Sequence, residues 1–242
     1  MTPSSLTNPV TLPQDIQEIA VTIAAKNLDP TLLSEQFLKL SGIVPNEWEA
    51  ARQPVFSPGG SQIVFKNGLG IVAQPRTVTF METMGNKPQE EILVAKIAIQ
   101  FIDKLPNAEY QGLTISPKYL IPFPQNADGA RQYITRTLLA PGPWQDFGQA
   151  PVQAGVNFLY QFEGCQLSLG INQATLQLPD QGNVSALLFA GNFNYPIENP
   201  DPQARLKMLH QYLNGWQSDL GTFRGIVYDR FLAQRQPETV FG

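Results

Sequence analysis

The sequence predicts an α+β fold: two β-α-β(3-4)-α units forming a mainly antiparallel, curved sheet with long helices on one face. Three observations support this prediction. Short segments in which apolar and polar residues alternate, as in half-buried strands, recur in both halves of the chain. Asp29 and Asp128 each cap the start of an expected helix, and these two helix starts are offset by roughly 100 residues, as in a duplication. Each half also ends in a longer expected helix, at 88–104 and at 202–220.

A first unit over residues 15–106 is expected to follow a flexible N-terminal tail of residues 1–14, which is rich in Pro, Ser and Thr. Its expected elements are, in order, a strand at 16–25, a helix from Asp29 to near Gly42, a short strand near Val55, strands on both sides of Asn67-Gly68, and a helix from Pro88 to about Lys104.

The segment Gly68-Leu69-Gly70-Ile71-Val72-Ala73 matches the glycine fingerprint of dinucleotide-binding loops. Such a loop needs a helix directly after the glycines, because the helix N-terminus receives the pyrophosphate. The sequence continues instead with alternating β-branched residues, and Pro75 would break a helix that had just begun. Asn67-Gly68 is also a strong signal for a tight hairpin turn. The segment therefore predicts a hairpin.

The second unit, residues 107–242, is expected to repeat this order and to pack with the first as one globular domain. Its expected elements are a strand at 113–123, a helix at 128–139, strands at 152–162, 166–171, 174–178 and 185–195, a helix at 202–220, and a final element at 223–231.

The helix near 92–105 is apolar almost all round, which is typical of a helix buried on more than one side. It is expected to lie between two layers of the protein or against a second copy of the chain in a homodimer.

The composition limits the classes of partner. Charged residues make up only 15% of the chain, the net charge is −4 and the sequence pI is about 5.0. Proteins that bind nucleic acid normally carry a basic face, and Lys and Arg are not clustered here. We therefore expect neither nucleic acid nor a membrane surface as a partner. Without a secretory signal or a long apolar run, the chain is expected to be soluble and cytoplasmic.

The chain contains few of the residue types that commonly act in catalysis. Cys165 is the single cysteine and His210 the single histidine, so neither a cysteine-rich metal site nor a disulfide is expected. A Cys165–His210 pair remains as a nucleophile–base possibility. Glu90-Glu91 is explained by the start of a helix, where acids are favourable. We expect no catalytic residue, no metal and no cofactor.

One loop is expected to bind a partner. The segment 140–148 places Trp144 and Phe147 on a loop between the units that is stiffened by prolines. Aromatic anchors are favoured in protein recognition. The alternative is that Trp144 pins the loop to the protein's own core.

Two resemblances follow from these elements. The repeated strand–helix–strands–helix order resembles the TATA-box-binding-protein class of duplicated folds, and implies one curved sheet with long helices on its convex face. The strand pair at 62–80, the long helix and the strand from Ala108 to Tyr119 resemble a sporadically distributed bacterial family of uncharacterised α+β proteins. That family has no assigned chemistry, so both resemblances imply a shape and not an activity.

The leading expectation is thus a non-catalytic interaction or adaptor protein that acts through the open sheet face or the 140–148 loop. Two alternatives stay open. One is a carrier that holds an apolar small molecule between the sheet and the long C-terminal helix. The other is a hydrolase using Cys165 and His210.

Overall fold

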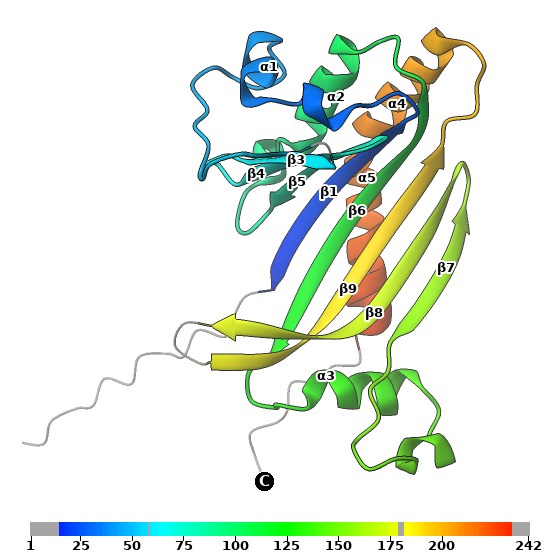
Figure 1. Ribbon diagram of the computed structural model, residues 1–242. Coiled ribbons are helices and arrows are strands. Elements are labelled where there is room, and N and C mark those ends of the chain that lie inside the picture. The colour runs from blue at the N-terminus through cyan, green and yellow to red at the C-terminus, as the bar shows by residue number, and fades with distance from the viewer. Residues whose placement is uncertain (1–14, 58, 179–181, 234–242) are drawn as a thin grey trace, which may run out of the picture.

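The computed structural model describes residues 15–57, 59–178 and 182–233, so the expected tail of residues 1–14 lies outside the described residues. The described chain is an α+β protein with one nine-stranded sheet in the order β2-β3-β4-β5-β1-β6-β9-β8-β7 (Figure 1). Each pair of neighbouring strands is antiparallel. No helix in the described part of the chain is long and apolar enough to cross a membrane.

The first half contains a strand, short helices, four further strands and a longer helix. Its elements are β1 (Ile16–Ala25), η1 (Pro30–Leu32), α1 (Glu35–Leu40), β2 (Val55–Ser57), β3 (Gly60–Val64), β4 (Leu69–Gln74), β5 (Thr77–Thr83), η2 (Gln89–Glu91) and α2 (Val94–Lys104).

The second half repeats this order with three strands after its first helix. Its elements are β6 (Tyr110–Phe123), α3 (Gly129–Gln132), η3 (Tyr133–Leu138), η4 (Pro143–Asp146), β7 (Val156–Phe162), β8 (Cys165–Leu178), β9 (Gly182–Pro196), α4 (Pro202–Asn214), α5 (Trp216–Gly225) and η5 (Ile226–Phe231).

The duplicated order is visible in the sheet. The first strands of the two halves, β1 and β6, pair with each other at the centre. Each is flanked on its other side by the last strand of its own half, β5 beside β1 and β9 beside β6. Outside β5 lie β4, β3 and β2 in that order, and outside β9 lie β8 and β7. The predicted fold of two β-α-β(3-4)-α units in one antiparallel sheet is confirmed.

The glycine pair forms a chain reversal, as predicted. Gly68 has φ +90°, in the left-handed region that glycine adopts without steric cost. The turn is closed by bonds between the backbones of Phe65 and Leu69 (2.9 Å) and of Gly68 and Phe65 (3.0 Å). Gly70 lies within strand β4, opposite Met81, and no helix begins there. The hairpin prediction is therefore confirmed and the dinucleotide loop is excluded.

The helices expected in the first half are shorter than predicted. The helix expected from Asp29 to Gly42 is two pieces, because Ser34 caps a new helix by accepting a bond from the Phe37 amide. The helix expected from Pro88 begins only at Val94, after the separate turn η2. In both cases a separate short turn and a new helix start divide a continuous apolar pattern.

Other boundaries of the second half also differ from the prediction. The strands expected at 166–171 and 174–178 are one strand, β8, which pairs with β9 along its whole length. The helix expected at 202–220 is divided at Gly215 into α4 and α5. The helix expected at 128–139 and the element at 223–231 both end in π-helical turns, η3 and η5.

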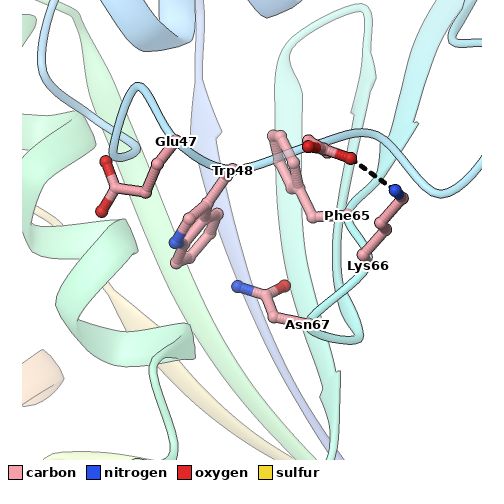
Figure 2. A pocket seen from close by; sticks show the side chains of 6 residues that line it. Glu47, Trp48, Phe65, Lys66 and Asn67 are labelled. Atoms are coloured by element: carbon pink, nitrogen blue, oxygen red, sulfur yellow. Dashed lines mark hydrogen bonds and ion pairs between the residues drawn. The ribbon is translucent and has the colours of Figure 1, made fainter.

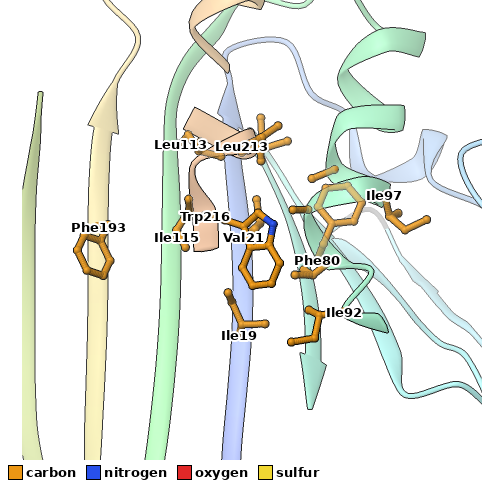
Figure 3. Close-up of a cluster of buried hydrophobic side chains, with 14 of the residues drawn as sticks. Ile19, Val21, Phe80, Ile92, Ile97, Leu113, Ile115, Phe193, Leu213 and Trp216 are labelled. Atoms are coloured by element: carbon orange, nitrogen blue, oxygen red, sulfur yellow. The ribbon is translucent and has the colours of Figure 1, made fainter. Parts of the chain in front are cut away.

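One face of the sheet is the core. Helices α2, α4 and α5 pack on it, and Figure 3 shows apolar side chains of the sheet meeting those of the helices. Phe80 of β5 meets Phe101 of α2 edge to face (5.5 Å), and Tyr119 of β6 meets Phe223 of α5 in the same way (5.0 Å). The long helices thus cover one face, as predicted.

This packing also accounts for the apolar helix at 92–105. Most apolar side chains of α2 are buried against β1, β5 and α4 of the same chain. The helix therefore packs on the sheet and beside α4 within one helical layer, and not between two layers as expected. Its apolar character no longer argues for a homodimer through this helix.

Candidate interaction surface

The second face of the sheet carries no helix over its central strands β1, β6 and β9 in the described part of the chain (Figure 1). We call it the open face. Several of its central side chains are small, polar and uncharged. They are Thr22, Thr79, Thr114, Ser116, Ser168, Asn192 and Asn194.

Strand register places these side chains in rows across the sheet. Thr79, Thr22, Thr114, Asn194 and Gln166 lie directly opposite one another on five neighbouring strands. Side chains in such cross-strand positions are close enough to interact. The row therefore crosses the boundary between the two halves without interruption.

Hydrogen bonds join neighbours within the rows. The hydroxyls of Thr22 and Thr79 are 2.9 Å apart, and Thr114 donates to the Asn194 side chain over 3.1 Å. In the next row Ser116 donates to the Asn192 side chain over 2.8 Å. These bonds orient the side chains relative to one another across the strands.

The charge on this face is balanced. Lys118 of β6 and Glu18 of β1 lie opposite each other and form an ion pair of 2.9 Å. A phosphate backbone would need several cations in its path. The open face therefore fits a neutral polar partner better than a nucleic acid.

A first cavity, of about 310 Å³, lies beside the β3–β4 turn (Figure 2). Trp48 and Phe65 form its apolar wall with their rings edge to face at 5.3 Å. The ammonium group of Lys66 is paired with the Glu49 carboxylate, and Glu47 adds a second acid to the lining. These two acids disfavour the binding of a phosphate group in this cavity, which lies next to the glycine-containing segment 68–73.

A second cavity, of about 240 Å³, lies between the central strands and α5. It joins both halves: Gln17 and Met84 come from the first, and Tyr119, Leu220 and Arg224 from the second. Burial raises the pKa of the Tyr119 hydroxyl to about 12, so this group stays a neutral hydrogen-bond donor at neutral pH.

The loop residues Trp144 and Phe147 are both exposed, with 38% and 88% of their surface accessible. The indole of Trp144 donates to the carbonyl of Ala140 over 3.2 Å, which folds the ring back onto its own loop. Gln145 anchors the same loop by donating to the Thr135 carbonyl (2.8 Å). Phe147 is thus presented to solvent, and its role in binding stays a prediction.

The structure gives Cys165 and His210 different partners. His210 on α4 lies 2.8 Å from the Asp103 carboxylate of α2. Cys165 on β8 is buried, and burial raises the pKa of its thiol, with Tyr195 as the hydrogen-bonding neighbour. A buried thiol with a raised pKa is a poor nucleophile. The geometry therefore gives no support to a Cys165–His210 pair.

Next to Cys165 lies an acid that the sequence did not reveal. The Tyr195 hydroxyl donates to Asp219 of α5, with 2.8 Å to each carboxylate oxygen. Burial nevertheless raises the pKa of Asp219 to about 6, and the bond from Tyr195 only partly offsets this effect. Burial and the neighbouring Asp219 carboxylate raise the pKa of Tyr195 itself.

A second acid missed at the sequence level is Glu82 of β5, which is 1% exposed. Its carboxylate accepts bonds from the backbone amides of Leu93 (2.7 Å) and Val94 (3.0 Å) and pairs with the Lys87 ammonium (2.7 Å). Glu82 therefore caps α2 from a neighbouring strand. A polar residue in an alternating strand gives no signal of this role, because it lies on another element and outside the short capping motif of the helix that it caps.

In the part of the chain that the structure describes, no group of three or more His, Cys, Asp or Glu side chains could hold a metal ion. Neither a protein-family model nor a curated protein matches the sequence significantly. The resemblance to the sporadically distributed bacterial family thus stays an expectation.

Proposed function

We propose that this protein is a non-catalytic interaction protein that binds a partner protein through the open face of its sheet. One observation carries the proposal: an uncharged row of hydrogen-bonding side chains crosses the sheet on the face opposite the helices. Non-obligate protein interfaces are polar at their rim and depleted of charge at their core. The low charge of the open face fits this pattern.

The electrostatics favour a protein over a nucleic acid as the partner. The chain is acidic overall, with a net charge of −4, and the Lys118 ammonium on the open face is already paired with Glu18. A neutral polypeptide surface or loop supplies amide and hydroxyl groups that match the Thr and Asn side chains without counterion release.

Site-specific photocrosslinking in the protein's own cells tests this proposal. A photoreactive residue is placed at Thr114, at the centre of the open face, or at Gln211, an exposed position on α4 on the helical side of the sheet. We expect a discrete protein adduct from position 114 and none of that mass from position 211. Equal adducts from both positions, or nucleic acid bound at position 114, would contradict the proposal.

The carrier alternative has one supporting observation, the cavity between the central strands and α5. The cavity is lined by Arg224 as well as by apolar side chains, while the Lys87 ammonium at the same cavity is paired with Glu82, so Arg224 is the cation that would suit a small anionic amphiphile. Native mass spectrometry of the protein purified from its own cells distinguishes this alternative. A stoichiometric small-molecule adduct that is lost in Arg224→Glu supports it, and the bare chain mass contradicts it.

A further inference from the structure

The edge strand β7 is a surface that the proposed function does not use. It ends the sheet order, and within the described residues its only strand partner is β8. One row of its backbone amides and carbonyls therefore faces away from the sheet, a template for pairing with another strand. Natural edge strands are commonly protected by charge, proline, a bulge or short length.

β7 has none of these protections. Its sequence from Val156 to Phe162 is VNFLYQF, seven residues without charge or proline, in unbroken register with β8. Leu159 and Phe162 expose 69% and 37% of their surface. The opposite edge of the sheet, β2, is only three residues long and follows directly on Pro54. The two edges therefore differ in their readiness to pair.

The order of side chains in β7 is chemically symmetric about Leu159. Aromatic residues stand on both sides of it, amides one position further out, and apolar residues at the ends. In an antiparallel pair with a second β7 centred on Leu159, each side chain meets its own chemical class. The opposed pairs are Leu159 with Leu159, Phe158 with Tyr160, Asn157 with Gln161, and Val156 with Phe162. This self-complementarity is what an isologous two-fold interface requires.

Charge also fits this register. Glu163, the first acid after β7, lies opposite Gly155 of the second copy and not opposite another Glu163. Like charges directly opposite each other destabilise a strand pair, and this arrangement avoids them.

We propose that β7 pairs with β7 of a second copy of this chain, in antiparallel register centred on Leu159. The pairing joins two nine-stranded sheets into one continuous sheet and aligns their open faces, because Leu159 lies in the same open-face row as Ser168. The inference rests on β7 alone and does not require the proposed partner binding.

The first test is the mass of the full chain in solution, measured by size-exclusion chromatography with light scattering at micromolar concentration. We expect twice the chain mass of 26.7 kDa. Leu159→Lys places two ammonium groups together on the two-fold axis and should raise the dimer dissociation constant by about tenfold or more. Leu40→Lys, at an exposed leucine on α1, is the matched control and should leave the dimer intact.

The second test reads the register by disulfide trapping in a Cys165→Ala background. Leu159→Cys places two cysteines opposite each other, with Cα atoms about 4.5–5.5 Å apart, within the range that a disulfide spans. Asn157→Cys places them about 14 Å apart. We expect a crosslinked dimer from Leu159→Cys, none from Asn157→Cys alone, and one again when Asn157→Cys and Gln161→Cys chains are mixed.

A monomeric wild-type chain would overturn the inference. So would a dimer that withstands Leu159→Lys, or one that crosslinks through Asn157→Cys alone, because each places the contact on another surface or in another register.

Discussion

The two halves of the molecule repeat one order of elements, yet they bury their acidic side chains differently. In the first half, Glu82 is almost fully buried and its carboxylate receives two backbone amides and the Lys87 ammonium. In the second half, Asp219 is partly buried and receives the Tyr195 hydroxyl, and its pKa is raised to about 6. A buried charge is tolerated where several donors surround it, and is destabilising where they are few.

The first half needs a buried acid on a strand because its last helix, α2, lacks a cap of its own. α2 has no side-chain cap of its own, so the strand residue Glu82 fills that role. α4 begins at Asp201, whose side chain accepts bonds from Gln203 and Ala204 (3.2 Å each), so no strand residue is needed there. The repeated architecture thus fixes where helices lie, while individual residues decide how each one is stabilised.

The largest expected effect is in the first half. Glu82→Ala leaves two helix-terminal amides without their acceptor and the Lys87 ammonium without its carboxylate, and should lower the free energy of unfolding by about 3 kcal/mol. Urea denaturation measures this change. Glu35→Ala, which removes the surface pair with Lys39, is the control and should cost about 0.5 kcal/mol or less. Equal losses in the two variants would refute the capping role.

A smaller effect is expected where α5 packs on the sheet. A Cβ at Gly191 would lie 2.7 Å from the Phe223 ring, so Gly191→Ala should overpack the core and cost about 1–3 kcal/mol. At Gly70 the nearest atom is the flexible Met81 side chain at 3.0 Å, and Gly70→Ala should cost about 1 kcal/mol or less. Thermal unfolding of both variants gives the comparison, and the reverse order of cost would contradict the packing described.

The next prediction concerns pH. The pKa of Asp219 is higher in the folded protein than in the unfolded chain, so the folded protein binds more protons than the unfolded chain between about pH 4 and pH 6. The contribution of Asp219 to the free energy of unfolding therefore falls as pH rises through that window. Asp219→Asn keeps an acceptor for Tyr195 and removes the charge. Its stability relative to the wild type should therefore increase from pH 4 to pH 7, by about 1–2 kcal/mol after allowance for solvent screening.

Urea unfolding of both proteins across this pH range isolates Asp219, because the other titrating groups are common to the two chains. A difference that does not change with pH would show that Asp219 ionises as freely as an exposed carboxylate.

The smallest effect is expected in the 140–148 loop. Phe147 is 88% exposed, so Phe147→Ser should change the free energy of unfolding by about 0.5 kcal/mol or less. Thermal unfolding checks this value. A loss above about 1 kcal/mol would mean that Phe147 packs on the protein itself and is not presented for binding.

The architecture could be predicted from the sequence because its signals are local. Alternation over 16–25 marks β1, Asn67-Gly68 marks the hairpin, and the apolar pattern near 92–105 marks α2. Helix boundaries were predicted wrongly where a cap was not recognised: Ser34 caps α1 locally and divides one expected helix, and Glu82 of a strand fixes the start of another. The Glu82 cap needs the strand and the helix to be packed together, so the short capping motifs of helix starts do not reveal it.

The candidate surface was predictable only in part. An open sheet face was expected, but its side chains could not be named, because the row from Thr79 to Gln166 exists only once five strands are in register. Likewise Tyr195 and Asp219 are separated by an entire helix and a turn. Trp144 and Phe147 were named from composition, and their exposure agrees with a binding role without testing it.

The binding role of the open face is tested most directly by the affinity for the protein partner captured at position 114. Isothermal titration compares the wild type with Thr114→Arg, which puts a bulky charge in the centre of the row, and with Gln211→Arg on the helical side. The open-face account predicts about tenfold or greater weakening for Thr114→Arg and unchanged affinity for Gln211→Arg. Unchanged affinity in Thr114→Arg, with the protein folded, would contradict it.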